Sequence, residues 1–135
     1  MNYSKLDWGL LLLRLIFGTR IVYGVIDNVL SWEQMIEFQN FLSANGFPFP
    51  LFCAVTSVYI QLLAGLSWFV GYQTRIASTL MIFNFLVAII GFHLAQGDSY
   101  LGTAPALHLL TISILLLLTG PGAISVDQKL APKLG

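Results

Sequence analysis

Apolar and polar stretches alternate along this chain, and four of the apolar stretches are unusually long. Their approximate ranges are 8–30, 50–72, 75–95 and 101–119. A helix needs about 20 mostly apolar residues to cross the hydrocarbon core of a bilayer, so each stretch qualifies as a span. We therefore expect an all-α membrane protein whose single domain, residues 1–135, is a bundle of four transmembrane helices.

The polar connection between the first and second spans has a helical pattern of its own. Large apolar residues recur at helical spacing among acidic and amide residues from about 32 to 44. Ser31 and Gln34 fit a capping box at its start, and Asn45 with Gly46 marks its end. We expect a short amphipathic helix that lies at the membrane surface or folds back over the bundle. The alternative is an ordinary solvated helix.

The composition indicates that lipid is the solvent for most of the surface. Hydrophobic residues make up 57% and charged residues only 9% of the chain, whereas a soluble domain carries about a quarter charged residues. The net charge is zero, so we expect no nucleic-acid partner. The single cysteine excludes an internal disulfide framework. No small-residue cleavage site follows the first apolar stretch, so we expect it to remain as an anchor.

The placement of charged residues predicts an orientation. With four spans, the basic residues that flank them share one side of the membrane: Lys5, Arg75, Lys129 and Lys133. The acidic residues of the loops share the other side: Glu33, Glu37 and Asp98. Because basic residues concentrate in cytoplasmic loops, we expect a multi-pass protein of the bacterial inner membrane with both termini in the cytoplasm.

Polar residues inside the spans gather at one depth. Counting the helical rise places a set from all four spans in the outer half of the membrane: Arg20, Tyr23, Asp27, Cys53, Tyr59, His93 and His108. Ionisable side chains at this depth face the bundle or a wet cavity, because exposure to lipid is costly. We therefore expect a mildly cationic site between the helices that opens to the outer side and binds a small anion.

Each candidate residue has a structural alternative. Arg20 can bind an anion through its planar set of donors, or it can form an ion pair with Asp27. Arg14 can contribute to the site, snorkel to the inner interface, or play a structural role. Tyr23 belongs to the predicted binding face, and Tyr59 can line a quinone path or join the aromatic belt of the interface.

Three residues are candidates for the chemistry itself. His93 and His108 titrate near neutral pH and can relay protons, although a buried histidine is often a satisfied core residue. Cys53 can act as a redox nucleophile if a nearby cation lowers its pKa, although an unpaired cysteine often serves as a small core residue. These residues do not have the spacing of a metal site, and we expect no bound metal.

Five motifs along the chain are familiar: "LLLRLIFGTRIVYG", "FLSANGFPFP", "GLSWFVGYQTRIAS", "VAIIGFHL" and "GPGAISVD". In order and spacing they resemble the DoxX family of small four-span membrane proteins. Arg14, Gly24, His93 and the closing motif, residues 120–127, match positions of the family pattern. Two positions depart from it: Tyr23 stands where the family has histidine, and His108 lies where a glutamate is common.

The resemblance implies a function as well as a fold. Some family members resemble subunits of thiosulfate:quinone oxidoreductase, which joins two thiosulfates into tetrathionate and passes two electrons to membrane quinone. We expect this activity, with Cys53, His93 and His108 as catalytic residues and quinone as the electron acceptor, and no haem or flavin. The alternatives are a membrane anchor for a soluble redox protein and a small-anion transporter. A homo-oligomer or a second redox subunit is an open possibility.

Overall fold

The computed structural model describes residues 2–134, and within them the regular structure is entirely helical. The elements are α1 (Lys5–Leu30), α2 (Trp32–Ala44), α3 (Pro50–Val70), α4 (Thr74–Ala88), η1 (Ile89–Leu94), α5 (Tyr100–Thr119) and α6 (Val126–Leu134). Four helices are long and apolar enough to cross a membrane: α1, α3, α4 continued by η1, and α5. The predicted all-α bundle of four membrane helices is therefore confirmed.

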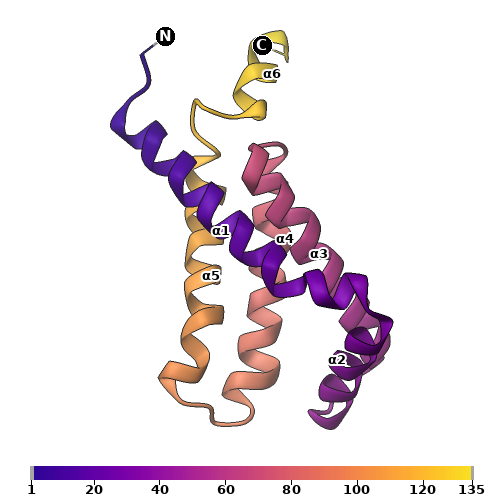
Figure 1. Cartoon of the computed structure of the whole chain (residues 1–135). Helices are drawn as coiled ribbons and strands as arrows, with labels where there is room; N and C mark the ends of the chain where they lie inside the picture. The colour runs from indigo at the N-terminus through magenta and orange to yellow at the C-terminus, as the bar shows by residue number, and fades with distance from the viewer. Residues whose placement is uncertain (1, 135) are drawn as a thin grey trace.

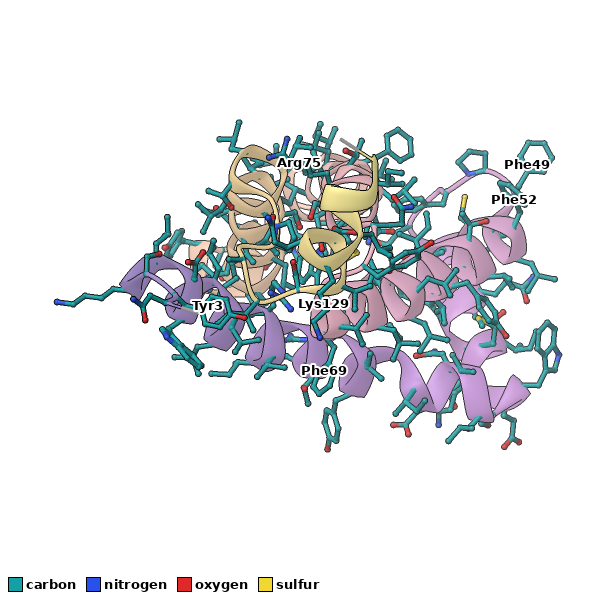
Figure 2. All side chains as sticks on the ribbon, turned by 90° about the horizontal axis from the view of Figure 1, so that it is seen from above. Tyr3, Phe49, Phe52, Phe69, Arg75 and Lys129 are labelled. Atoms are coloured by element: carbon teal, nitrogen blue, oxygen red, sulfur yellow. The ribbon has the colours of Figure 1, made fainter. Side chains whose placement is uncertain are left out.

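The four long helices pack in the order α1, α3, α4, α5. Figure 1 shows α1 crossing α3 obliquely, with α4 and α5 side by side and both chain termini at the same end of the molecule. Apolar side chains cover much of the outer surface, and in Figure 2 Phe69 points away from the helices. Such a surface suits lipid, because the hydrocarbon core offers no partners for polar groups.

Two glycines allow α1 and α3 to approach closely. A Cβ atom on Gly18 would lie 2.7 Å from the carbonyl oxygen of Gly65, and a Cβ on Gly65 would lie 3.0 Å from that of Gly18. Membrane helices use small residues in this way to bring their backbones together. These two glycines therefore serve contacts within one chain.

The amphipathic helix α2 folds back on the bundle, which is one of the two arrangements predicted for it. It buries Met35 and Leu42 in a cluster with Ala54 and Val58 of α3. The Ser31 hydroxyl accepts a hydrogen bond from the backbone N–H of Gln34 at 3.4 Å. Only this half of the predicted capping box is found among the described residues.

Two elements were not predicted. The last part of the third span, η1, is a π-helix, in which backbone bonds join residues five apart. The chain also forms a short helix, α6, after the motif at residues 120–125. Both elements take part in the polar contacts described below.

Candidate functional site

Arg14 lies at the centre of a polar network at the end of the bundle that carries both termini. Its side chain is only 1% exposed. The guanidinium donates to the backbone oxygen of Trp68 at 2.9 Å, of Pro121 at 2.7 Å and of Ile124 at 2.8 Å. We call these contacts the Arg14 network. They join α1 to the end of α3 and to the loop after α5, and they leave little room for a ligand.

Two aspartates tie the same loop to the helices. The carboxylate of Asp127 accepts from the backbone N–H groups of Gln73 at 2.7 Å and Thr74 at 3.0 Å, which caps the start of α4. The carboxylate of Asp7 accepts from the N–H of Ala123 at 3.0 Å. The closing motif of the chain thus has a structural task, because it links α1, α3 and α4.

A cavity lies at the opposite end, between α2, α3, α4 and η1. Its volume is about 380 Å³, within the range of roughly 300–1,000 Å³ that is usual for small-molecule sites. We call it the phenylalanine cavity, because six phenylalanines line it: Phe38, Phe41, Phe47, Phe52, Phe83 and Phe92. Figure 2 shows Phe52 with Phe49 at one edge of the molecule, where α3 begins.

A few polar side chains interrupt the apolar wall of this cavity. They are Cys53, Thr56, Ser57, Asn84 and His93. An apolar pocket with a small number of placed polar groups is the usual design of a small-molecule site. The phenylalanine cavity is therefore the best candidate for ligand binding.

A hydrogen-bonded chain joins this cavity to a second one. The amide nitrogen of Gln61 donates to the Ser57 hydroxyl at 3.1 Å, and that hydroxyl donates to Oδ1 of Asn84 at 2.7 Å. Gln61 lines a more polar cavity of about 390 Å³ between α1, α2 and α3, together with Asn28, Gln34 and Glu37. We call this second space the glutamate cavity.

His93 has a carboxylate partner outside the membrane span. Its Nδ1 lies 2.8 Å from Oδ2 of Asp98, and the backbone N–H of Asp98 donates to the His93 carbonyl at 2.8 Å. The hydrogen bond from His93 lowers the pKa of Asp98 below its usual value, and a bond from the Ser99 N–H adds to this effect. A carboxylate on one ring nitrogen orients the imidazole and leaves the other nitrogen for chemistry.

The structure brings two of the predicted site residues together. Cys53 and His93 both line the phenylalanine cavity. The Cys53 thiol donates to the backbone oxygen of Pro48 at 3.2 Å. These two residues can act on the same bound molecule.

The other predicted residues lie elsewhere. Arg20, Tyr23 and Asp27 lie exposed along α1, with Tyr23 80% exposed. Tyr59 borders a separate apolar hollow between α3 and α4, and His108 is exposed on α5. Residues at the same depth thus lie on different faces of their helices, and the phenylalanine cavity does not contain the predicted set of anion-binding side chains.

The alternative role of Arg20 as the partner of Asp27 is not seen. Within residues 2–134 the ion pair found is that between His93 and Asp98. The Arg20 guanidinium lies instead over the backbone of Gly24, where a Cβ atom would come within 3.2 Å of Nη1. Arg20 is therefore a cation on the exposed surface of a membrane helix.

Sequence reasoning missed four polar residues near the cavity. Ser57 and Gln61 are four residues apart on α3, a spacing that places them on one face, but neither looks reactive alone. Asn84 is a single amide within an apolar span, and the sequence does not show which face of the helix it occupies. Asp98 follows His93 by five residues, and the turn after η1, in which the Asp98 N–H bonds to the His93 carbonyl and Gly97 has a positive φ, brings the two side chains together. Among the described residues, no three His, Cys, Asp or Glu side chains are placed to share a metal ion.

The fold and the cavity define a class: a small multi-pass membrane protein of four apolar helices, with a ligand-sized cavity under a short amphipathic helix. The sequence pattern of the DoxX family matches residues 9–94, which is more than half of the chain. The chain therefore belongs to the DoxX family, and the resemblance in its motifs is confirmed.

One relative adds a location. The chain is similar to "Inner membrane protein YphA" of Escherichia coli (strain K12), with 28% identity over 125 residues that cover 85% of this chain and 89% of that protein. With the four apolar helices, this relative supports a multi-pass protein of the inner membrane. No solved structure matches the chain.

Proposed function

We propose that this chain is the quinone-binding membrane subunit of an oxidoreductase. The observation that carries the proposal is the phenylalanine cavity, whose apolar walls and few polar groups suit a flat, uncharged ring. The ring pair Phe41 and Phe92, with centroids 4.9 Å apart, offers aromatic faces and edges to such a ring. A bound quinone supplies the electron acceptor.

The proposed electron donor is a small sulfur anion, most directly thiosulfate, as the family resemblance implies. Two thiosulfates become one tetrathionate and release two electrons, and a quinone takes up two electrons and two protons. His93, held by Asp98, is placed to deliver protons at the cavity wall. It is also the one lining residue that can carry the positive charge an anion needs.

Cys53 permits a covalent route at the same cavity. Its thiolate bonds to the outer sulfur of one thiosulfate, and the two electrons released pass to the quinone. The outer sulfur of a second thiosulfate then attacks the bound one, which forms tetrathionate and returns the thiolate. With both termini in the cytoplasm, as the basic residues favour, the cavity lies toward the outer side.

The direct test is quinone reduction by the purified full-length protein with thiosulfate, sulfite or sulfide as donor. We expect reduction with thiosulfate that is lost in His93→Gln and retained in His108→Gln, because only His93 lines the cavity. Full activity in Cys53→Ala would exclude the covalent route through Cys53 and would leave the rest of the proposed function unchanged. No reduction with any donor, from a folded sample, would contradict catalysis by this chain by itself.

A second candidate function rests on Arg20. An arginine exposed on a membrane helix is costly in lipid, and a partner protein that supplies an acceptor would remove that cost. In this second function, the chain is a membrane anchor or assembly partner for a soluble redox protein, which binds along α1. The anchor function predicts that a partner co-purifies with the wild-type protein and is lost in Arg20→Ala. Thiosulfate-dependent quinone reduction by the protein alone would speak against it.

A further inference from the structure

The hydrogen bonds between Gln61, Ser57 and Asn84 have one direction. The amide nitrogen of Gln61 donates to the Ser57 oxygen at 3.1 Å. A serine hydroxyl has a single proton to donate, and that of Ser57 goes to Oδ1 of Asn84 at 2.7 Å. The oxygen of the Asn84 amide therefore accepts the bond from Ser57, and the NH₂ group of the same amide is left to donate to another partner.

The remaining NH₂ group belongs to a cavity residue. Asn84 is partly buried in the middle of α4 and lines the phenylalanine cavity. Within the described part of the chain, its side-chain nitrogen donates no hydrogen bond. An amide NH₂ carries two donors, and leaving them unused in apolar surroundings costs free energy. A ligand with an acceptor atom would remove this cost.

From this arrangement, the geometry points to Asn84 as the oriented donor that binds a carbonyl oxygen of a flat, apolar ligand. The inference rests on the proposed function and deepens it, because it names the recognised atom of the quinone class. The phenylalanine rings contact the apolar part of the ligand, and Asn84 selects for an acceptor at one position. Ser57 and Gln61 are positioning residues, since they fix which end of the Asn84 amide faces the cavity.

The test uses decylubiquinone with isotope-labelled carbonyls as the probe and the purified full-length chain in lipid nanodiscs. A binding titration gives the affinity, and an infrared difference spectrum reports hydrogen bonding at the bound carbonyl. With the wild-type protein we expect saturable binding and a carbonyl band shifted to lower frequency. Both readouts are independent of turnover.

The informative variant is Asn84→Asp, which keeps the size of the side chain and the acceptor for Ser57 but removes the NH₂ group. We expect roughly tenfold weaker binding, the effect of one lost hydrogen bond and an uncompensated acceptor, and loss of the band shift. Ser57→Ala should broaden or reduce the shift, because the amide loses its orientation. The control is Asn40→Asp, the same change at an exposed position of α2, which should preserve both readouts.

The outcomes separate the inference from the proposed function. If decylubiquinone binds Asn84→Asp with the wild-type affinity and band, Asn84 is not the donor, and quinone binding itself stands. If the wild-type protein does not bind decylubiquinone, the inference and the proposed function both fail. If Asn84→Asp does not fold, the Ser57→Ala variant provides the test. A carbonyl band in Ser57→Ala identical to that of the wild-type protein would overturn the inference.

Discussion

Two arginines on the same helix have opposite surroundings. Arg14 is buried and donates three hydrogen bonds to backbone oxygens, whereas Arg20 lies exposed and has no carboxylate within ion-pair distance among the described residues. They are six residues apart, which turns them to different faces of α1. The rotational position on the helix, as well as the depth in the membrane, thus decides what an intramembrane charge does.

The two ends of the bundle differ in the same way. In the Arg14 network, side chains bond to backbone groups of other segments, and the polar atoms are used up in holding the fold. At the phenylalanine cavity, Asn84 and His93 each use one polar atom within the fold, on Ser57 and Asp98, and within the described residues the Asn84 NH₂ group and the second ring nitrogen of His93 have no protein partner. A polar group that has no hydrogen-bond partner within the fold is available to a ligand.

The largest expected effect is the loss of stability in Arg14→Met. The change leaves three backbone oxygens without their donor, at Trp68, Pro121 and Ile124. Since a bond to a charged group contributes about 1.5–3 kcal/mol, we expect the free energy of unfolding to fall by roughly 4 kcal/mol or more. Denaturant titration of the protein in detergent measures it.

The matched control for that variant is Arg20→Met on the same helix. Its guanidinium is exposed and forms no ion pair with a described residue, so we expect no fall in the free energy of unfolding. Equal destabilisation by the two variants would contradict the contrast between the two arginines. The comparison holds residue type and helix constant and varies only the contacts.

Filling the phenylalanine cavity should have the next largest effect, on affinity. Val87→Phe adds a ring to the cavity wall, because Val87 lines that space. We expect decylubiquinone to bind at least about tenfold more weakly, a loss of about 1.4 kcal/mol, with little change in the unfolding temperature. Leu86→Phe is the control, since Leu86 is equally exposed, 41% for each residue, but does not line the cavity.

A smaller loss is expected from Asp127→Ala at the Arg14 end. The carboxylate caps α4 through the N–H groups of Gln73 and Thr74, and loss of a cap costs roughly 0.5–2 kcal/mol. Thermal unfolding should show this loss, while the affinity for quinone stays at the wild-type value. A drop in affinity without a drop in stability would link this end of the bundle to the ligand site.

The smallest expected effect is a pH dependence at the cavity end. The pKa of Asp98 is lowered in the folded protein, chiefly by the hydrogen bond from His93. Its stabilising contribution is therefore complete above the ordinary pKa of about 4 and is lost as the pH falls through the lower folded value. Backbone amides of residues 89–99 should lose exchange protection below about pH 4, after correction for intrinsic rates. In Asp98→Asn this loss of exchange protection below about pH 4 should be absent.

The sequence predicts the spans and the amphipathic helix because both depend on local patterns of apolar residues. It predicts depth as well, since a helix rises by a constant amount per residue. It does not predict which face of α1 meets α3, because that depends on the contact between Gly18 and Gly65. The same holds for the other spans: Cys53 and His93 face one cavity between α3 and η1, whereas Arg20 and His108 are exposed on other helix faces.

Partners that are backbone atoms are the hardest to foresee. Two of the three acceptors of Arg14, the backbone oxygens of Pro121 and Ile124, lie in a loop more than a hundred residues away in sequence, and nothing in their side chains marks them. The pairing of His93 with Asp98 depends on the turn after η1, closed by the bond from the Asp98 N–H to the His93 carbonyl, which no apolar pattern indicates. The polar chain through Ser57 depends on two helices that meet only in the folded protein.

The most direct test of the account is photoaffinity labelling of the full-length protein in nanodiscs with an azido derivative of decylubiquinone, followed by peptide mapping. We predict saturable labelling, displaced by unlabelled quinone, in residues 52–60 of α3 and 83–93 of α4 and η1, which line the phenylalanine cavity. Labelling confined to the exposed face of α1 around Arg20, or labelling that excess quinone does not displace, would contradict the assignment of this cavity as the ligand site.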